Sequence, residues 1–266
     1  MSGFQAKGIC AGYGAKRVID GLSLSMESGR VMGILGANGS GKTTLIKSIC
    51  GILRHEGECM LEGVTLEKLS ARQLAQKCSY IPQRSGISID LSALDVVLMG
   101  FNPQLKLLAH PSAAMKKQAL EALEMVGLGD RTQENYLNLS EGQKQLCILA
   151  RTLVADSRLL LLDEPESALD FRFRYRMLST IRDWVQSDGR FALVTLHDPM
   201  LALNGCDDLL ILKDGRNIGV LHPGTDSFEK MEELLCAVYG RVSLVSCADR
   251  TGRRHIVMLK EGEDAL

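Results

Sequence analysis

The chain has 266 residues, of which 45% are hydrophobic and 24% charged, and its formal net charge is −1. Its length allows one large globular domain or two modest ones with a substantial core. The near-neutral charge argues against nucleic acid as a partner, although a local site can still bind one nucleotide. The apolar runs fall well short of the roughly 20 residues of a membrane helix, and the N-terminus lacks the apolar region of a signal peptide. A membrane function would therefore need another chain to cross the bilayer.

The first quarter of the chain combines short strand patterns with a glycine-rich loop. Apolar runs around Gly8–Cys10, Val18–Met26 and Glu58–Leu61 predict a small antiparallel sheet. The continuous run Val31–Leu35 leads into the loop, and a helix is predicted from Thr43 to Ile52. This order, strand then loop then helix, is typical of a phosphate-binding element.

The middle of the chain is predicted to be helical. From about residue 85 to residue 154 there is no strong strand pattern. Apolar residues at helical spacing predict a helix over Ser112–Val126 that stops at Gly127, and a second one over Gln143–Leu153. We expect this stretch to be a helical insertion between strands.

Two further apolar runs end in polar residues. Leu159–Leu162 leads into Asp163 and Glu164, and Phe191–Leu196 leads into His197. Continuous apolar runs are typical of strands buried on both faces of a parallel sheet. Open α/β sheets bind their ligands just beyond the ends of such strands. The sequence therefore predicts an α/β fold with a mainly parallel sheet and a site at its edge.

The C-terminal segment has a pattern of its own. A helix is predicted over Phe228–Val238, followed by two short strands, Val242–Cys247 and His255–Leu259. We accordingly divide the chain into a main domain, residues 1–225, and an extension, residues 226–266. This extension of about forty residues is shorter than a typical domain.

The sharpest motif is the loop from Gly36 to Thr43, which matches the pattern G-x-x-x-x-G-K-[ST]. Its glycines let the backbone curl so that several N–H groups point at phosphates, and the following helix adds its positive N-terminal end. Lys42 is expected on the β- and γ-phosphates, and the Thr43 hydroxyl on Mg²⁺. The residues expected to bind ATP here are Gly36, Asn38, Gly39, Ser40, Gly41, Lys42, Thr43 and Thr44.

A pair of carboxylates supplies the second half of the expected site. Asp163, at the end of a buried strand, can hold Mg²⁺, and Glu164 is placed to polarise an attacking water. Many strands end in Asp-Glu, so the pair alone says little. Its combination with the phosphate loop predicts nucleotide hydrolysis.

A family resemblance follows from the remaining motifs. The segment Leu139–Gln143 resembles the L-S-G-G-Q signature of the ABC ATPases, with Glu141 in place of the first glycine. Asp163-Glu164-Pro165 and the following Ser167–Asp170 resemble the Walker B motif and D-loop of that family. Gln83 matches its Q-loop, His197 its H-loop and Tyr13 its adenine-stacking aromatic residue. The resemblance covers residues from about 4 to 220, in matching order and spacing.

The resemblance implies a P-loop NTPase fold and a role for each residue. Two nucleotide-binding domains would pair head to tail, with each ATP between the phosphate loop of one subunit and the signature of the other. Ser140 and the backbone N–H groups of Gly142 and Gln143 would contact the γ-phosphate in trans. The resemblance also implies that Glu164 is the catalytic base and that His197 orients the γ-phosphate. Gln83 would sense Mg²⁺ and water, and Asp170 would cross the dimer interface.

Two residues depart from the family pattern. A carboxylate aimed at a γ-phosphate would be repelled, so Glu141 is expected to point away from it, stabilised by a helix N-terminus. Slower hydrolysis is expected, rather than its loss. Glu166 stands where the family often has threonine and is a milder departure.

Other side chains have plainer interpretations. Phe171–Arg176 alternates aromatic and basic residues, which could indicate a nucleic-acid strip, but a helix with solvated arginines is favoured. No two of the eight cysteines form a C-x-x-C pair, so we expect no metal cluster and interpret them as small core residues in a reducing compartment. Four histidines without partner spacing are predicted on the surface or in loops: His55, His110, His222 and His255.

Three functions are compatible with these motifs. A transport ATPase is favoured, because the chain has one nucleotide-binding domain without a coiled-coil or zinc insert. The alternatives are a soluble ABC ATPase acting on ribosomes or nucleic acid, and a regulatory ATPase that has lost turnover. Ser92–Gly100 and the tail with Tyr239-Gly240 resemble the import ATPases for iron–siderophore, haem and cobalamin. The resemblance implies an importer subunit at the cytoplasmic face of the cell membrane, with a second nucleotide-binding subunit, permease subunits and, indirectly, a periplasmic or extracellular binding protein as partners.

Overall fold

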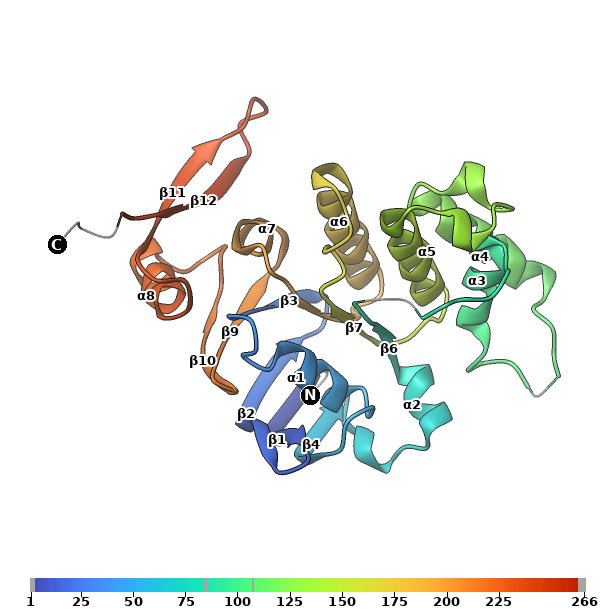
Figure 1. Cartoon of the computed structure of the whole chain (residues 1–266), viewed down its shortest axis with the longest axis horizontal. Coiled ribbons are helices and arrows are strands. Elements are labelled where there is room, and N and C mark those ends of the chain that lie inside the picture. Colours follow the sequence, from blue (N-terminus) through green and yellow to red (C-terminus); the bar gives the residue numbers. More distant parts are fainter. Residues whose placement is uncertain (1–2, 84–85, 107, 263–266) are drawn as a thin grey trace.

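The computed structural model describes residues 3–83, 86–106 and 108–262. Its N-terminal part is an antiparallel sheet in the order β2-β1-β4-β5 (Figure 1). The strands are β1 (Gly3–Tyr13), β2 (Lys16–Glu27), β4 (His55–Leu61) and β5 (Val64–Thr65). The small antiparallel sheet is thus confirmed, with strands longer than predicted. Along β2 from Leu22 buried and exposed residues alternate strictly, as expected for a strand with one face on a core.

A second sheet of six strands lies beside the first, in the order β10-β9-β3-β8-β7-β6. Its strands are β3 (Arg30–Leu35), β6 (Cys78–Ile81), β7 (Leu159–Asp163), β8 (Phe191–Thr195), β9 (Asp208–Lys213) and β10 (Arg216–Leu221). All neighbours are parallel except the β9–β10 hairpin. The mainly parallel sheet is therefore confirmed. Strands β6, β9 and β10 were not predicted. Ser79 interrupts β6 and Gly219 interrupts β10, whereas the unbroken run Leu209–Leu212 of β9 was a signal that the sequence analysis missed.

Helices lie around the parallel sheet, and α3 and α4 pack on α5 rather than on the sheet itself (Figure 1). The α-helices are α1 (Lys42–Ile49), α2 (Ala71–Lys77), α3 (Ala93–Leu98), α4 (Ala113–Met125), α5 (Glu141–Leu153), α6 (Phe171–Ser187), α7 (Pro199–Gly205) and α8 (Phe228–Tyr239). Short 3₁₀ turns lie at Leu66–Lys68, Met99–Phe101, Gly129–Arg131 and Tyr136–Asn138. The helices α3, α4 and α5 lie between β6 and β7, where the helical insertion was predicted. No helix among the described residues is both long enough and apolar enough to span a bilayer.

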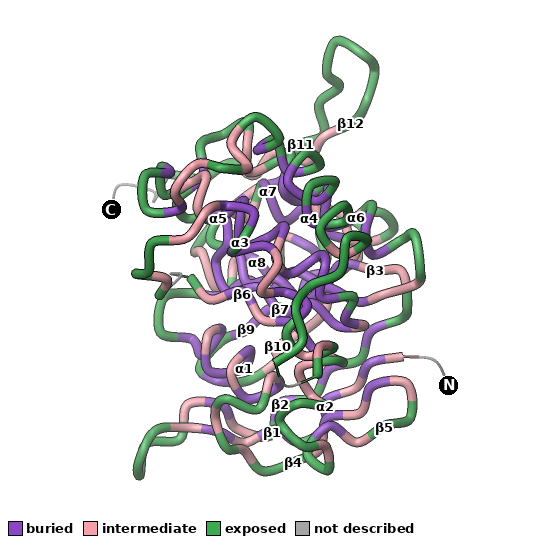
Figure 2. The backbone as a smooth tube through the Cα atoms, turned by 90° about the vertical axis from the view of Figure 1, so that its right-hand side faces the viewer, coloured by how far each residue is buried: buried purple, intermediate pink, exposed green. Residues whose placement is uncertain are grey.

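Each face of the parallel sheet borders its own hydrophobic core. Along β7, Leu160 and Leu162 belong to the core under the helices, whereas Leu159 and Leu161 belong to the core shared with the antiparallel sheet. This division follows from the period of two of a strand. Figure 2 shows the buried residues gathered between these layers. A continuous apolar strand is therefore required at this place, as the sequence indicated.

The C-terminal elements extend the larger core. Helix α8 contributes Met231 and Leu235 to it, and the hairpin strand β11 (Val242–Ala248) adds Val242 and Leu244. Beyond these residues β11 and its partner β12 (Arg254–Lys260) project from the body of the molecule (Figure 1). The hairpin is therefore anchored at its base and exposed toward its turn.

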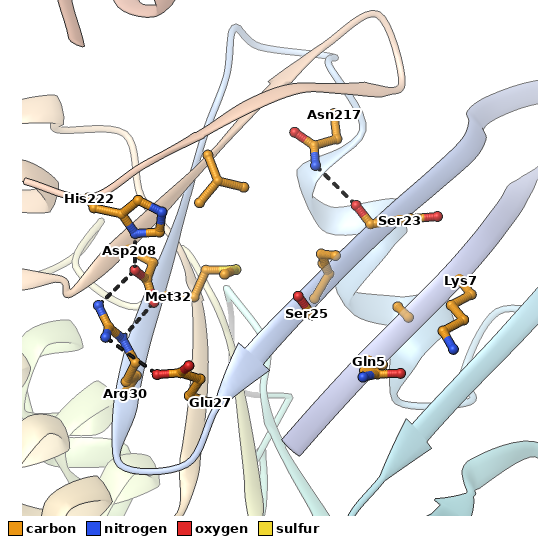
Figure 3. Close-up of a pocket in the computed structure, with 13 residues that line it drawn as sticks. Gln5, Lys7, Ser23, Ser25, Glu27, Arg30, Met32, Asp208, Asn217 and His222 are labelled. Atoms are coloured by element: carbon orange, nitrogen blue, oxygen red, sulfur yellow. Dashed lines mark hydrogen bonds and ion pairs between the residues drawn. The ribbon is translucent and has the colours of Figure 1, made fainter. Parts of the chain in front are cut away.

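A hollow lined by ion-paired side chains lies at the junction of the two sheets (Figure 3). It has a volume of about 650 Å³. Within it, the buried Asp208 carboxylate accepts two hydrogen bonds from Arg30, at 2.8 and 2.9 Å, and lies 2.6 Å from His222 Nδ1. These charged groups satisfy one another, as buried ions must. The network therefore fastens β9 and β10 to β3.

Three of the four histidines predicted on the surface or in loops contact a carboxylate. His222 contacts Asp208, and His255 lies 3.0 Å from Asp249 in the hairpin turn. The surface prediction is wrong for His55, whose side chain is only 7% exposed and contacts Glu67. The carboxylate partners lie 6 to 14 residues away in sequence, so local spacing could not reveal them.

The helical insertion makes a close backbone contact that can be tested. A Cβ at Gly100 would lie 2.1 Å from the Arg151 carbonyl oxygen. Gly100→Ala should therefore lower the free energy of unfolding by about 1–3 kcal/mol or more, measured by urea denaturation. Gly129→Ala is the matched control, since its nearest neighbour would be 3.5 Å away. Equal midpoints for the two variants would contradict this packing.

Candidate functional site

The glycine-rich loop joins β3 to α1 at the edge of the parallel sheet. Gly39 and Gly41 have φ angles of 80° and 108°, which only glycine adopts readily. A Cβ at Gly36 would lie 2.4 Å from the Leu212 carbonyl oxygen. The loop thus needs glycine at positions 39 and 41 for their backbone conformation, and at position 36 because a side chain would not fit there.

Two polar side chains are enclosed by this loop. Lys42 Nζ donates to the carbonyl oxygens of Gly36, at 2.8 Å, and Ala37, at 3.4 Å. Burial lowers the pKa of Lys42, while the carboxylates of Glu164 and Asp163 act in the opposite direction. The Ser40 hydroxyl is buried without a hydrogen-bond partner in the described part of the chain. An ammonium group and an unpartnered hydroxyl within a curled loop fit the oxygens of a phosphate.

Asp163 lies beside the first turn of α1. Its Oδ1 accepts hydrogen bonds from Thr43 Oγ1, at 2.9 Å, and from Thr195 Oγ1, at 3.0 Å. Burial raises the pKa of Asp163, and these two hydroxyl groups act in the opposite direction. Hydroxyl and carboxylate oxygens at this separation are ligands that Mg²⁺ accepts. The two predicted ligands Thr43 and Asp163 are therefore placed together.

Glu164 contacts the two other residues predicted to be catalytic. Its Oε2 accepts a hydrogen bond from Gln83 Nε2 at 2.6 Å, and its Oε1 lies 2.6 Å from His197 Nε2. Its backbone has a φ of 50°, in the left-handed region, and its N–H donates to Thr195 Oγ1. Such strain persists only where the surroundings hold it, and it is concentrated at functional sites. The predicted residues Gln83, Glu164 and His197 thus form one cluster.

Glu166 has a role in this cluster that the sequence did not reveal. Its Oε1 accepts a 2.8 Å hydrogen bond from the His197 backbone N–H, while its buried Oε2 has no partner within the described residues. Burial raises the pKa of Glu166. The residue therefore holds the backbone of His197 next to Glu164. Thr195, which bonds both Asp163 and Glu164, was also missed, because a threonine at a strand end has no distinguishing pattern.

The raised pKa of Glu166 predicts a pH-dependent stability. In the unfolded chain this carboxyl ionises near 4.5, but in the folded chain it holds its proton to higher pH. The wild type should therefore lose stability as the pH rises from 4.5 through the raised pKa, by about 1.4 kcal/mol for each pH unit that separates the two pKa values. Glu166→Gln cannot ionise and should escape this loss, so its advantage should grow with pH and then level off.

Urea unfolding between pH 5 and 8, followed by the fluorescence of the single tryptophan, Trp184, would measure this difference. Glu229→Gln is the control, because Glu229 is fully exposed at the start of α8. Parallel stability profiles for the wild type and Glu166→Gln would contradict the prediction.

The signature segment forms the start of α5. Ser140 caps the helix: its Oγ accepts from Gln143 N–H, and Gln143 Oε1 accepts from Ser140 N–H. A Cβ at Gly142 would lie 3.1 Å from the Ala168 carbonyl oxygen, so this glycine packs closely on the D-loop. The Glu141 side chain is largely exposed and pairs with Lys144, one turn further along, at 2.8 Å.

Helix α5 also reaches the Glu164 cluster. Gln145 Nε2 donates to the backbone oxygen of Gln83 at 2.7 Å. The same Gln83 bonds Glu164 through its side chain. One residue thus connects the signature helix to the carboxylate at the end of β7.

The other predicted site residues lie outside the Glu164 cluster. Asp170 caps α6 through a hydrogen bond from Phe173 N–H, and Tyr13 is half exposed at the end of β1. The helix predicted after the D-loop is present as α6, but two of the three arginines predicted to be solvated make hydrogen bonds. Arg174 donates to the Leu169 carbonyl oxygen and Arg176 to that of Met125.

The comparisons with known proteins decide the family. Residues 19–167, more than half of the chain, match the family model of the ABC transporter. The chain belongs to this family. It is 36% identical over 231 residues to the hemin import ATP-binding protein HmuV of Bordetella pertussis, covering 84% of this chain and 87% of that protein. It is 35% identical over 212 residues to an iron chelatin transport ATP-binding protein of Helicobacter pylori, covering 79% of this chain and 83% of that protein.

A solved structure agrees with this assignment. An inward-facing structure of a metal-chelate type ABC transporter matches with a TM-score of 0.81 and 25% identity, covering 97% of this chain and 98% of that one. This ABC ATPase is therefore an ATP-binding and ATP-hydrolysing transport subunit. The expected ABC ATPase fold is confirmed. The comparisons give no support to the alternative of an ATPase acting on ribosomes or nucleic acid.

Proposed function

We propose that this ABC ATPase powers the import of a metal chelate, such as haem, an iron–siderophore or cobalamin. The observation that carries the proposal is the similarity to a metal-chelate type transporter over 97% of the chain. That coverage includes elements of the C-terminal extension, residues 226–266, which we distinguish from the nucleotide-binding domain, residues 1–225. The names of the two relatives, for hemin and for iron chelatin, point to the same class of substrate.

The residues at the edge of the parallel sheet would each have a separate role in ATP hydrolysis. The phosphate loop would hold ATP through its N–H groups, Lys42 and the Ser40 hydroxyl. Mg²⁺, held by Thr43 and Asp163 with Gln83 nearby, would neutralise charge on the phosphates. Glu164 would accept the proton of the attacking water. His197, held by Glu166 through its backbone, would orient that water and the γ-phosphate.

The remaining predicted residues would act in a pair of subunits. In a head-to-tail homodimer, Ser140, Gly142 and Gln143 of one subunit would contact the γ-phosphate bound by the other. Asp170 would cross the interface, and Tyr13 would stack on adenine. The exposed Glu141 pairs along its own helix, so it need not point at the phosphate. The subunits would lie at the cytoplasmic face of the membrane and contact the permease subunits. A periplasmic or extracellular binding protein would deliver the substrate to those permeases.

Co-purification tests this function. The tagged chain would be isolated from gently solubilised native membranes and its partners identified by mass spectrometry. A polytopic permease should be recovered, and in proteoliposomes with the matching binding protein its haem, siderophore or cobalamin ligand should stimulate ATP hydrolysis. Recovery with a permease stimulated only by a substrate without a metal would overturn the metal-chelate assignment. Recovery without any permease would overturn the transport role.

A further inference from the structure

Three possible metal ligands converge outside the nucleotide site. His55 and Cys59 lie on β4 and Glu67 lies in the 3₁₀ turn Leu66–Lys68. His55 Nε2 is 2.9 Å from Glu67 Oε1 and 3.9 Å from Cys59 Sγ. One ligand atom from each of the three residues lies within 4.8 Å of the others. We call this cluster the His55–Cys59–Glu67 triad; the spacing of the cysteines alone, on which the expectation of no metal cluster depended, does not reveal it.

The pairing of β4 with β1 is irregular between His55 and Cys59. Residues four apart on a straight strand have Cα atoms about 13 Å apart. Between the pairs Lys7–Glu58 and Cys10–Glu56, β1 has two residues and β4 has only Gly57, so β1 carries a bulge opposite Gly57. Gly57 has a φ of 95°, and a Cβ there would lie 2.5 Å from the Lys7 carbonyl oxygen, so only glycine fits. A bulge bends the paired strands and increases their twist, and at this bend His55 Nε2 lies 3.9 Å from Cys59 Sγ.

The charge and the donor atoms of these three side chains suit a divalent ion that prefers sulfur and nitrogen ligands. A thiolate and a carboxylate together neutralise a divalent cation, and the imidazole binds as a neutral ligand. Sulfur and nitrogen donors favour Zn²⁺ and similar ions over Mg²⁺ or Ca²⁺. A neutral complex is required here, because Cys59 is fully buried and the His55 side chain is 7% exposed.

A pocket gives access to the triad. His55 and Glu67 line an apolar hollow of about 740 Å³. Three protein ligands leave one position of a tetrahedral ion for a water molecule, which could enter through this hollow beside His55 and Glu67. Residues Ser48–Cys50, at the C-terminal end of the helix that starts at Lys42, line the same hollow.

We propose that the His55–Cys59–Glu67 triad is a binding site for Zn²⁺ or a similar thiophilic divalent ion, bound through Cys59 Sγ, His55 Nε2 and one Glu67 oxygen. On binding, the Cys59 thiol loses its proton to solvent, and His55 carries its proton on Nδ1. Burial raises the pKa of the Cys59 thiol, so the ion itself must displace this proton. The site is separate from the nucleotide site, and the proposal does not depend on the transported substrate.

Cobalt absorption tests the proposal directly. The full-length chain, stripped with a chelator and kept reduced with a phosphine, would be titrated with CoCl₂. We expect a thiolate-to-cobalt charge-transfer band at one equivalent, which Zn²⁺ then abolishes. Cobalt bound at Asp163 cannot give this band, since its predicted ligands include no cysteine. Binding should also raise the thermal midpoint of the wild type.

Variants assign the ligands. Cys59→Ser should remove the charge-transfer band, and Glu67→Gln, which keeps an acceptor for the Cys59 N–H, should weaken binding by at least about tenfold. Cys50→Ser and Cys78→Ser are the controls, because both thiols line the same hollow. Circular dichroism would confirm that each variant folds. If Cys59→Ser does not fold, the cobalt affinity of Glu67→Gln decides whether the triad binds the metal. Absence of the band in the wild type, its survival in Cys59→Ser or unchanged affinity in Glu67→Gln would overturn the proposal.

Discussion

Replacing Glu164 by glutamine should lower kcat for ATP hydrolysis by about two to four orders of magnitude, because the amide cannot accept a proton from water. The structure places this carboxylate 2.6 Å from both Gln83 Nε2 and His197 Nε2. Glutamine has nearly the same shape, so ATP binding should persist. The variant should then accumulate as an ATP-bound dimer, which size-exclusion chromatography with Mg-ATP would detect.

Glu134→Gln is the matched control for this change. Glu134 is a partly exposed glutamate that pairs with Arg131 in the helical insertion, away from the Glu164 cluster. Its turnover should equal that of the wild type. Rapid hydrolysis by Glu164→Gln would remove the proposed base from the mechanism, whereas loss of ATP binding would show that Glu164 mainly shapes the site.

Replacing Lys42 by alanine should abolish measurable ATP binding or reduce hydrolysis by a comparable factor. Lys42 is the buried ammonium group of the phosphate loop, and its Nζ already lies against the loop carbonyl oxygens of Gly36 and Ala37. Because the phosphates carry several negative charges, loss of this cation removes a charge-assisted contact in a poorly hydrated place. Equilibrium binding of a fluorescent ATP analogue would measure the loss.

Lys47→Ala controls for the loss of a lysine from the same helix. Lys47 lies in the last turn of α1 and is only half-buried. This variant should bind ATP nearly as well as the wild type. Equal affinities for Lys42→Ala and the wild type would mean that phosphate is bound elsewhere.

The parts of the fold that could be predicted are those with local signals. The β7 run Leu159–Leu162 is buried on both faces of the sheet, and its unbroken apolar pattern predicts this burial. Ser112 and Ser140 cap helices close to the predicted starts, because capping depends on residues three positions apart. Strand β6 has only four residues, so its place depends on pairing with β7 rather than on its own pattern.

The site shows the same division between local and long-range information. The phosphate loop is continuous in sequence, so Gly36 to Thr43 could be assigned from their order alone. The bonds of Glu166 to His197 and of Asp163 to Thr195 span 31 and 32 residues. The His55–Cys59–Glu67 triad lies beside a bulge in β1, opposite Gly57, that no spacing rule describes. Contacts of this kind are set by sheet register, which the sequence of one strand does not contain.

Gln83 makes two bonds at once, with its side chain to Glu164 and with its backbone oxygen to Gln145. The bond to α5 uses the backbone, so a substitution at position 83 would remove the side-chain bond to Glu164 and leave the acceptor for Gln145 in place. The contact with Glu164 and the connection to the signature helix can therefore be changed separately, the first at position 83 and the second at position 145.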